Sequence, residues 1–226
     1  MSRRDLRREG RAFDLVVFDW DGTLADSTAL IARAIQAACR DLGVPPPADS
    51  AAKYVIGLGF ISAVKHVAPT LDPAEYRTFS AAYRAHYLAE EPEIPLFQGA
   101  RELLEELDAA GYLIAVATGK SRAGLEHAIA RAGLGGVFHA TRCGDEGLPK
   151  PHPDMLLNLM SFLASAPERT LMIGDTTHDL ELARNAGVAA VAVTYGAHPA
   201  SELAQAAPLA VVSSVVELRD WLGGNG

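Results

Sequence analysis

Two pairs of acidic residues stand far apart in the sequence. Asp19 and Asp21 directly follow an apolar run, and Asp175 and Asp179 follow a second one. Carboxylates this close repel each other, and a cation or a shared proton relieves the repulsion. Hard oxygen ligands of this kind suit Mg2+, which keeps some waters and takes other ligands from a bound phosphate. The four residues therefore indicate a Mg2+ site, provided that the fold brings the two pairs together.

Groups suited to holding a phosphoryl group stand between the two acidic pairs. Thr118 offers a hydroxyl, the backbone around Gly119 offers amide donors, and Lys150 offers a positive charge. Positioning and charge stabilisation account for most of the catalysis in phosphoryl transfer. Gly22 would allow a tight turn beside Asp19. Together these residue types indicate chemistry on a phosphoryl group.

The elements that must position these residues alternate along most of the chain. Apolar, β-branched runs predict strands at residues 15–18, 113–117, 137–141, 170–173, 189–193 and 209–212. Helical patterns, several of which end at a glycine, fall at residues 100–110, 122–132, 154–163, 179–186 and 215–222. The alternation implies right-handed βαβ units and a parallel sheet with both faces covered. Ligands bind at the carboxyl ends of such strands, where the predicted site residues would meet.

An all-helical stretch interrupts this alternation after the first strand. A helix over residues 29–42 is followed by shorter, alanine-rich helical pieces as far as residue 93. We predict an α/β, doubly wound parallel-sheet core over residues 11–27 and 94–226, with a small all-helical domain inserted at 28–93. Residues 1–10 are expected to form a flexible N-terminal segment. Residues 56–60 of the insert either contact a substrate or form only a turn, and both interpretations stay open.

The composition limits the partners and the compartment. The 226 residues carry a net charge of -8, which disfavours nonspecific binding to nucleic acid or to an anionic membrane. No apolar run reaches the roughly 18 residues that span a bilayer. Cys39 and Cys143 are far apart and lack metal-ligand spacing, which indicates a reduced, cytoplasmic protein. We expect a monomer or a homodimer.

Four motifs in this order resemble those of the haloacid dehalogenase-like (HAD) hydrolase superfamily. Residues 18–24, Phe-Asp-Trp-Asp-Gly-Thr-Leu, resemble the first motif, and Thr118 matches the second. Lys150-Pro151 matches the third, and residues 174–179, Gly-Asp-Thr-Thr-His-Asp, resemble the fourth. The first and fourth motifs are specific, whereas the other two are weak alone. The resemblance implies a Rossmann-like core whose helical insert is a mobile cap, and it is closest to the phosphoglycolate phosphatase-like subgroup.

The resemblance also implies a Mg2+-dependent phosphatase of a small phosphorylated metabolite. Asp19 would be the nucleophile that forms an aspartyl-phosphate, and Asp21 would be the general acid/base. Mg2+ would be held by the Asp19 carboxylate, the Asp21 backbone carbonyl and Asp175. Asp179 would bind the metal through water or orient Lys150. The phosphate would be held by Thr118, Gly119 and Lys150, the last of which also counts as catalytic.

Other functions remain open. A sugar-phosphate mutase would use the same aspartyl-phosphate and return the phosphoryl group to a bound intermediate. A non-enzymatic phospho-receiver domain is doubly wound too, but it is about half this length and carries its phosphorylated aspartate after the third strand. Asp21 disfavours a dehalogenase or a phosphonatase, because both lack an acid at that position.

Four further polar residues receive structural interpretations. His152 and His178 are expected to be loop histidines near the site rather than ligands. Asp26 and Ser27 are expected to cap the helix that follows them.

Overall fold

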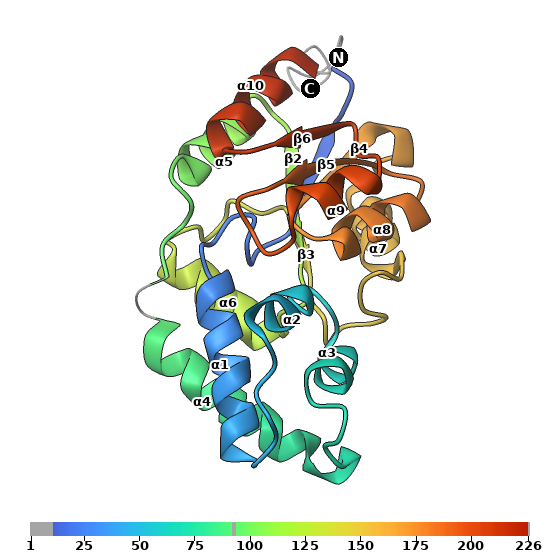
Figure 1. Ribbon diagram of the computed structural model, residues 1–226. Coiled ribbons are helices and arrows are strands. Elements are labelled where there is room, and N and C mark those ends of the chain that lie inside the picture. Colours follow the sequence, from blue (N-terminus) through green and yellow to red (C-terminus); the bar gives the residue numbers. More distant parts are fainter. Residues whose placement is uncertain (1–10, 92–93, 226) are drawn as a thin grey trace.

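A six-stranded sheet lies at the centre of the computed structural model, which describes residues 11–91 and 94–225. All its strands pair in parallel, in the order β3-β2-β1-β4-β5-β6 (Figure 1). The strands are β1 (Leu15–Phe18), β2 (Leu113–Ala117), β3 (Ala140–Arg142), β4 (Thr170–Gly174), β5 (Ala189–Val193) and β6 (Ala210–Val212). The predicted parallel α/β fold is confirmed, while the predicted N-terminal segment 1–10 lies outside the described residues.

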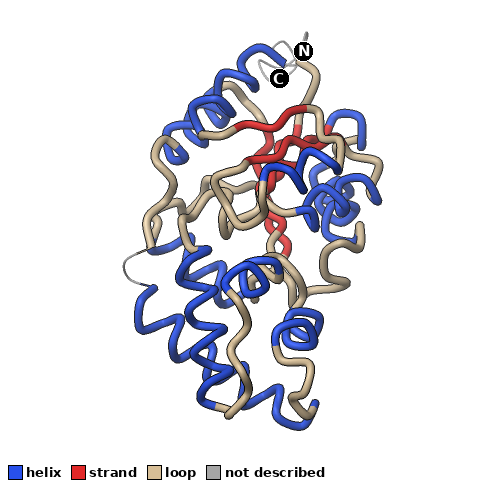
Figure 2. Tube along the Cα trace, viewed as in Figure 1, coloured by secondary structure: helices blue, strands red, loops and turns tan. Residues whose placement is uncertain are grey.

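Helices cover both faces of the sheet because its strands are apolar on both sides. In β1, Val16 and Phe18 join one hydrophobic cluster and Leu15 and Val17 join the other, as expected for side chains that alternate along a strand. The first cluster is covered by α5 (Ala100–Ala109), α6 (Arg122–Arg131) and α10 (Val215–Asn225). The second is covered by α7 (Asp154–Leu163), α8 (Thr177–Asn185) and α9 (Ala200–Gln205). Figure 2 shows this layering, with the red strands between blue helices.

The helical insert packs mostly on itself, at the lower end of the molecule in Figure 1. Its helices are α1 (Thr28–Asp41), α2 (Asp49–Tyr54), α3 (Phe60–Val67) and α4 (Tyr76–Glu90), with a 3-10 turn at Pro73–Glu75. They enclose a third hydrophobic cluster built from residues such as Ile31, Ile35 and Phe79. The described residues of the insert contain no strand. The limits of the insert as a separate domain, residues 28–93, stay a prediction.

Strand β3 and helix α9 differ from the sequence-based expectation. Strand β3 begins at Ala140 rather than near residue 137, because Val137 and Phe138 pack against the first cluster from outside the ladder. Helix α9 was not predicted, since its six residues bury only Leu203 and so show no helical period. None of the helices in the described part of the chain has the length and apolar character that a membrane span requires.

Candidate active site

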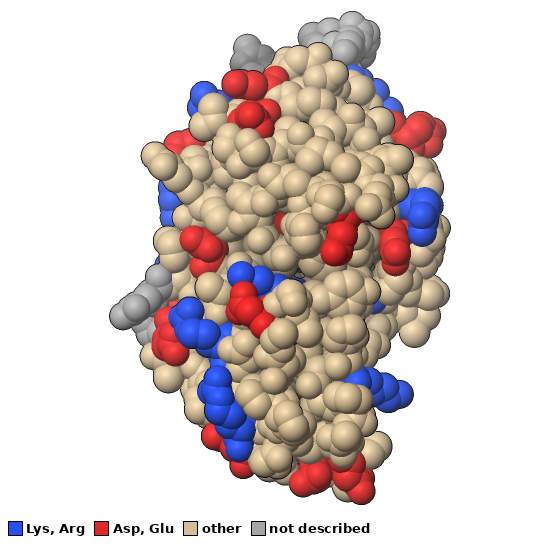
Figure 3. Space-filling model, viewed as in Figure 1, with Lys and Arg blue, Asp and Glu red and all other residues tan. Residues whose placement is uncertain are grey.

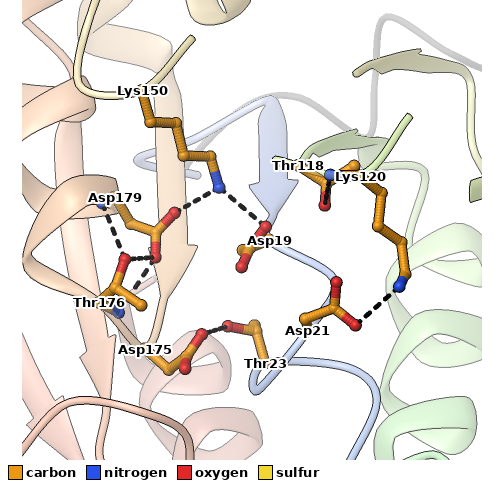
Figure 4. A network of polar contacts seen from close by, with 9 residues as sticks. All are labelled: Asp19, Asp21, Thr23, Thr118, Lys120, Lys150, Asp175, Thr176 and Asp179. Carbon is orange, nitrogen blue, oxygen red and sulfur yellow. Dashed lines mark hydrogen bonds and ion pairs between the residues drawn. The ribbon is translucent and has the colours of Figure 1, made fainter. Parts of the chain in front are cut away.

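The carboxyl ends of three neighbouring strands bring the predicted site residues together. Strand β1 lies between β2 and β4, and Phe18 is in register with Val116 and Ile173. The backbone N–H of Asp19 donates to the carbonyl of Ile173 at 2.9 Å, so Asp19 directly extends the ladder. The chain segments that follow β2 and β4 therefore begin beside Asp19. Figure 4 shows the polar network that results.

Three buried aspartates form the centre of this network. Asp19, Asp175 and Asp179 each offer a carboxylate oxygen, and these oxygens lie within 4.8 Å of one another. Burial and the two neighbouring carboxylates raise the pKa of Asp175 well above its usual range. The Oδ2 atom of Asp19 is buried and has no hydrogen-bond partner among the described residues. An all-oxygen donor set with an unpartnered buried oxygen fits a hard divalent cation.

Lys150 neutralises part of this negative charge. Its side chain is fully buried, and its Nζ lies 2.8 Å from Oδ1 of Asp19 and 2.6 Å from Oδ1 of Asp179. Burial lowers the pKa of Lys150, but the two carboxylates raise it by more, so the lysine stays charged. The second oxygen of Asp179 accepts from the backbone N–H and the hydroxyl of Thr176, at 3.1 and 2.7 Å. Of the two roles expected for Asp179, this direct contact favours the orientation of Lys150.

Asp175 is held by two hydrogen-bond donors, and two glycines leave room for its carboxylate. The hydroxyl of Thr23 donates to its Oδ1 at 2.8 Å, and the backbone N–H of Ala197 donates to its Oδ2 at 2.7 Å. A methyl group placed on Gly22, whose φ is +84°, would lie 2.1 Å from that Oδ2, and one on Gly196 would lie 2.2 Å from it. The carboxylate thus fits only because neither position carries a side chain.

The Asp21 side chain is not part of the three-aspartate cluster. Its Oδ1 accepts from the Ser27 hydroxyl at 2.6 Å and lies 3.1 Å from Nζ of Lys120. The expectation that Ser27 caps α1 is therefore wrong: Ser27 occupies the N-cap position, but its side chain makes no capping bond. Its hydroxyl binds Asp21 instead, and the exposed Asp26 makes no capping contact either. The expected metal contact of Asp21 through its backbone carbonyl stays a prediction.

A cavity of about 310 Å³ lies between the strand ends and the insert. Asp19, Asp21 and Thr118 form part of its lining, and residues 55–58 line it from the insert. The two sides meet closely, because a methyl group on Gly119 would lie 2.8 Å from the carbonyl oxygen of Gly57. Of the two interpretations of residues 56–60, the cavity favours substrate contact. Its lining also includes Phe60, Phe79, Tyr83, Arg84, Lys120 and Ser121.

Two of the predicted phosphate-binding groups face this cavity and one does not. Thr118 and Gly119 line it, and the Thr118 hydroxyl oxygen accepts the Lys120 backbone N–H at 3.2 Å, which leaves its own hydrogen free to donate. Lys150 is absent from the lining and lies on the far side of Asp19. Its action on a bound phosphate would therefore pass through the charge and position of Asp19.

The sequence profile of the haloacid dehalogenase-like hydrolase family matches residues 16–193, from β1 to the end of β5. The chain belongs to this family. The match contains each of the four motifs, and the structure now places all four at one sheet edge. Membership therefore agrees with the geometry of the site as well as with the sequence.

Individual relatives of this HAD-like hydrolase cover nearly its whole length. A probable phosphatase, IndB of Dickeya dadantii, is 38% identical over 210 residues, which span 90% of this chain and 91% of that protein. A phosphoglycolate phosphatase of Chromobacterium violaceum is 35% identical over 218 residues, spanning 92% and 95%. The crystal structure of a predicted phosphoglycolate phosphatase from Haemophilus somnus 129pt is 27% identical, with a TM-score of 0.81 and coverage of 93% and 98%.

Two histidines of this HAD-like hydrolase bind the insert. The backbone carbonyl of Tyr54, at the end of α2, lies 2.8 Å from Nε2 of His178 and 3.0 Å from Nε2 of His198. The Tyr54 ring also stacks on His198, with 5.2 Å between the centroids. His178 was expected in a loop and instead lies in the first turn of α8, which begins at Thr177. His152 is an exposed loop residue, as expected, and its Nδ1 accepts the backbone N–H of Asp154.

The raised pKa of Asp19 predicts a pH-dependent stability for the metal-free enzyme. Burial raises this pKa to about 7, although Lys150 lowers it. An aspartate in an unfolded chain titrates near about 4. The carboxyl group therefore contributes stability that is fully present below about pH 4 and is lost as the pH rises through about 7.

The Asp19→Asn variant provides the comparison with wild type, because the asparagine side chain does not titrate. We expect the melting temperature of Asp19→Asn in EDTA to rise progressively relative to wild type between about pH 5 and pH 8. Thermal melts across this range measure the difference. A difference in melting temperature that stays constant with pH would contradict the raised pKa of Asp19.

Proposed function

We propose that this HAD-like hydrolase is a Mg2+-dependent phosphatase of a small phosphorylated metabolite. The observation that carries the proposal is the buried cluster of three aspartates, in which Oδ2 of Asp19 has no partner, at the edge of a cavity of about 310 Å³. That volume lies at the small end of the range for small-molecule sites. The enclosing insert leaves space for a metabolite rather than for a macromolecular substrate.

The reaction follows from the positions of Asp19 and Asp21. A carboxylate oxygen of Asp19 attacks phosphorus, the bond from phosphorus to the ester oxygen breaks, and Asp21 gives that oxygen a proton. Water then attacks the aspartyl-phosphate, and Asp21 takes a proton from it. Phosphate leaves and the Asp19 carboxylate is regenerated. Thr118 and the Gly119 amide hold the nonbridging oxygens, and Lys150 keeps Asp19 ionised and oriented.

The residues present fit the metal that this chemistry needs. Asp19, Asp175 and the backbone carbonyl of Asp21 would hold Mg2+, and Asp179 would hold Lys150 beside them. When bound, Mg2+ would cancel the local negative charge and screen an anionic phosphate from the attacking carboxylate. The chain is acidic overall, and on the face shown in Figure 3 the acidic and basic side chains are interspersed between uncharged areas. The attraction for an anionic substrate must therefore arise locally.

Removal of the metal should abolish turnover. We expect phosphate release to fall to background in EDTA and to return with excess Mg2+, because three close carboxylates need a counter-charge before an anion can approach. A panel of 2-phosphoglycolate, glycerol 3-phosphate, glucose 6-phosphate and 4-nitrophenyl phosphate provides the substrates, with phosphate release as the measurement. Activity that is indifferent to the chelator would refute the metal assignment. A sugar-phosphate mutase would release little phosphate from any of the esters.

The setting of the enzyme completes the proposal. Cys39 and Cys143 are both buried and unpaired, which supports a reducing, cytoplasmic location. We propose that the enzyme acts on a small metabolite as a monomer or a homodimer, without a nucleic-acid or membrane partner.

A further inference from the structure

A lysine outside the four motifs lies between Asp21 and the helical insert. Lys120 follows β2 in the loop that carries Thr118, and its side chain is only 10% exposed. Its Nζ lies 3.1 Å from Oδ1 of Asp21 and donates to the hydroxyl of Tyr87 in α4 at 2.9 Å. The same Nζ lies 4.6 Å from the centroid of the Tyr87 ring. Lys120 thus connects a carboxylate of the core to a side chain of the insert.

The contacts of Lys120 leave one oxygen of Asp21 available. Lys120 and the Ser27 hydroxyl both bind Oδ1, and neither contact uses Oδ2. In Figure 4 the second oxygen of Asp21 points away from Lys120, toward the side where Asp19 and Thr118 lie. Asp21 and Lys120 both line the cavity. A carboxylate held through one oxygen by two donors presents the other oxygen to the cavity in a defined position.

The ion pair is well shielded from water. The side chains of Lys120 and Asp21 are 10% and 9% exposed. Burial lowers the pKa of Lys120, but Asp21 together with Tyr83 and Glu91 raises it by more, so the lysine keeps its charge. In such surroundings a charged pair is screened little and retains its geometry. The Tyr87 hydroxyl completes this arrangement only while α4 lies against the core.

We propose that Lys120 is a positioning residue for Asp21, and that Tyr87 makes this positioning depend on closure of the insert. The inference rests on the proposed function, because it presumes that Asp21 protonates the leaving oxygen. Lys120 acts through Asp21 and does not itself transfer a proton to the substrate. The competing role, direct binding of the phosphate by Lys120, would affect every ester equally.

Esters with different leaving groups distinguish the positioning of Asp21 from direct phosphate binding by Lys120. The alkoxide of an alkyl phosphate needs a proton as it departs, whereas 4-nitrophenolate departs without one. The value of kcat/KM reports the steps through departure of the leaving group, so hydrolysis of the aspartyl-phosphate does not enter it. The measurement is therefore kcat/KM for 4-nitrophenyl phosphate and for the fastest alkyl ester of the panel, both with saturating Mg2+.

We expect Lys120→Met to lower kcat/KM for the alkyl ester by about 50-fold and for 4-nitrophenyl phosphate by less than about 3-fold. Lys120→Arg keeps the charge and should restore a large part of the alkyl-ester activity. Tyr87→Phe keeps both charges and the ring, so it tests the inference even if Lys120→Met folds poorly. It should lower the alkyl-ester value by about 5-fold and leave the aryl value unchanged. Lys65→Met, at an exposed lysine of α3, is the matched control and should change neither value.

Equal losses on both esters would overturn the inference, because they would assign Lys120 to phosphate binding or to structure. Undiminished alkyl-ester turnover in Lys120→Met or in Tyr87→Phe would overturn it as well. Failure of the proposed function is recognised separately, in proteins that keep Lys120 and Tyr87. Turnover that persists in Asp19→Asn, or wild-type turnover that is absent for every alkyl ester, would refute the phosphatase mechanism itself.

Discussion

Asp19→Asn is expected to abolish phosphate release while the fold survives. The amide matches the carboxylate in size, and its oxygen can still accept from Lys150, whose Nζ lies 2.8 Å from Oδ1 in the native enzyme. It cannot attack phosphorus to form an acyl-phosphate. Loss of a nucleophile costs roughly four or more orders of magnitude in kcat. Phosphate release from the substrate panel, with circular dichroism and a thermal melt as folding checks, measures both parts of the expectation.

The same substitution should stabilise the metal-free enzyme. It removes one of three carboxylates whose oxygens lie within 4.8 Å of one another, so their mutual repulsion falls. Asp108→Asn, at an exposed position of α5, is the matched control and should leave both activity and stability at wild-type values. Turnover of Asp19→Asn near the wild-type rate would remove Asp19 as the nucleophile.

The catalytic edge of the sheet was predictable because it depends on local pattern. Asp19 and Asp175 each follow a short apolar run, and strands buried on both faces are recognisable as such runs. A parallel sheet brings the carboxyl ends of its strands to one edge, so the sequence alone predicts that the two acidic pairs lie together. The start of α8 was missed by two residues, although Thr176 and Asp179 form a capping box whose spacing is present in the sequence.

The contacts between core and insert were not predictable from local pattern. Ser27, just before the insert, has the residue type and position of a helix cap, but a hydrogen bond to Asp21, six positions earlier in the chain, replaces the capping bond. Lys120 follows the predicted site residue Thr118 by two positions, yet its partner Tyr87 lies 33 positions away on a helix of the insert. The Tyr54 carbonyl and His198 are 144 positions apart. No periodicity relates such residues, because their proximity depends on how the insert lies on the sheet.

Lys150→Met is expected to cause the largest loss of stability in the site. The lysine side chain is fully buried, with carboxylate oxygens at 2.8 and 2.6 Å. Methionine fills a similar volume but leaves Asp19 and Asp179 without a counter-charge. Breaking a buried ion pair from one side costs about 3–5 kcal/mol. Urea unfolding in EDTA measures this loss, and Mg2+ should recover part of it by supplying positive charge.

A double-mutant cycle assigns the loss to the charges. Asp179→Asn alone leaves Lys150 paired with Asp19. When Asp179→Asn is added to Lys150→Met, it removes one of the two carboxylates that the loss of the lysine has left without a counter-charge. The double variant should therefore be more stable than the sum of the single effects predicts, by roughly 1–3 kcal/mol. Lys65→Met should stay within about 0.5 kcal/mol of wild type, because that lysine is exposed. Additive effects in the cycle would mean that Lys150 stabilises the site by packing rather than by charge. Lys150 could not then be the residue that keeps the nucleophile ionised.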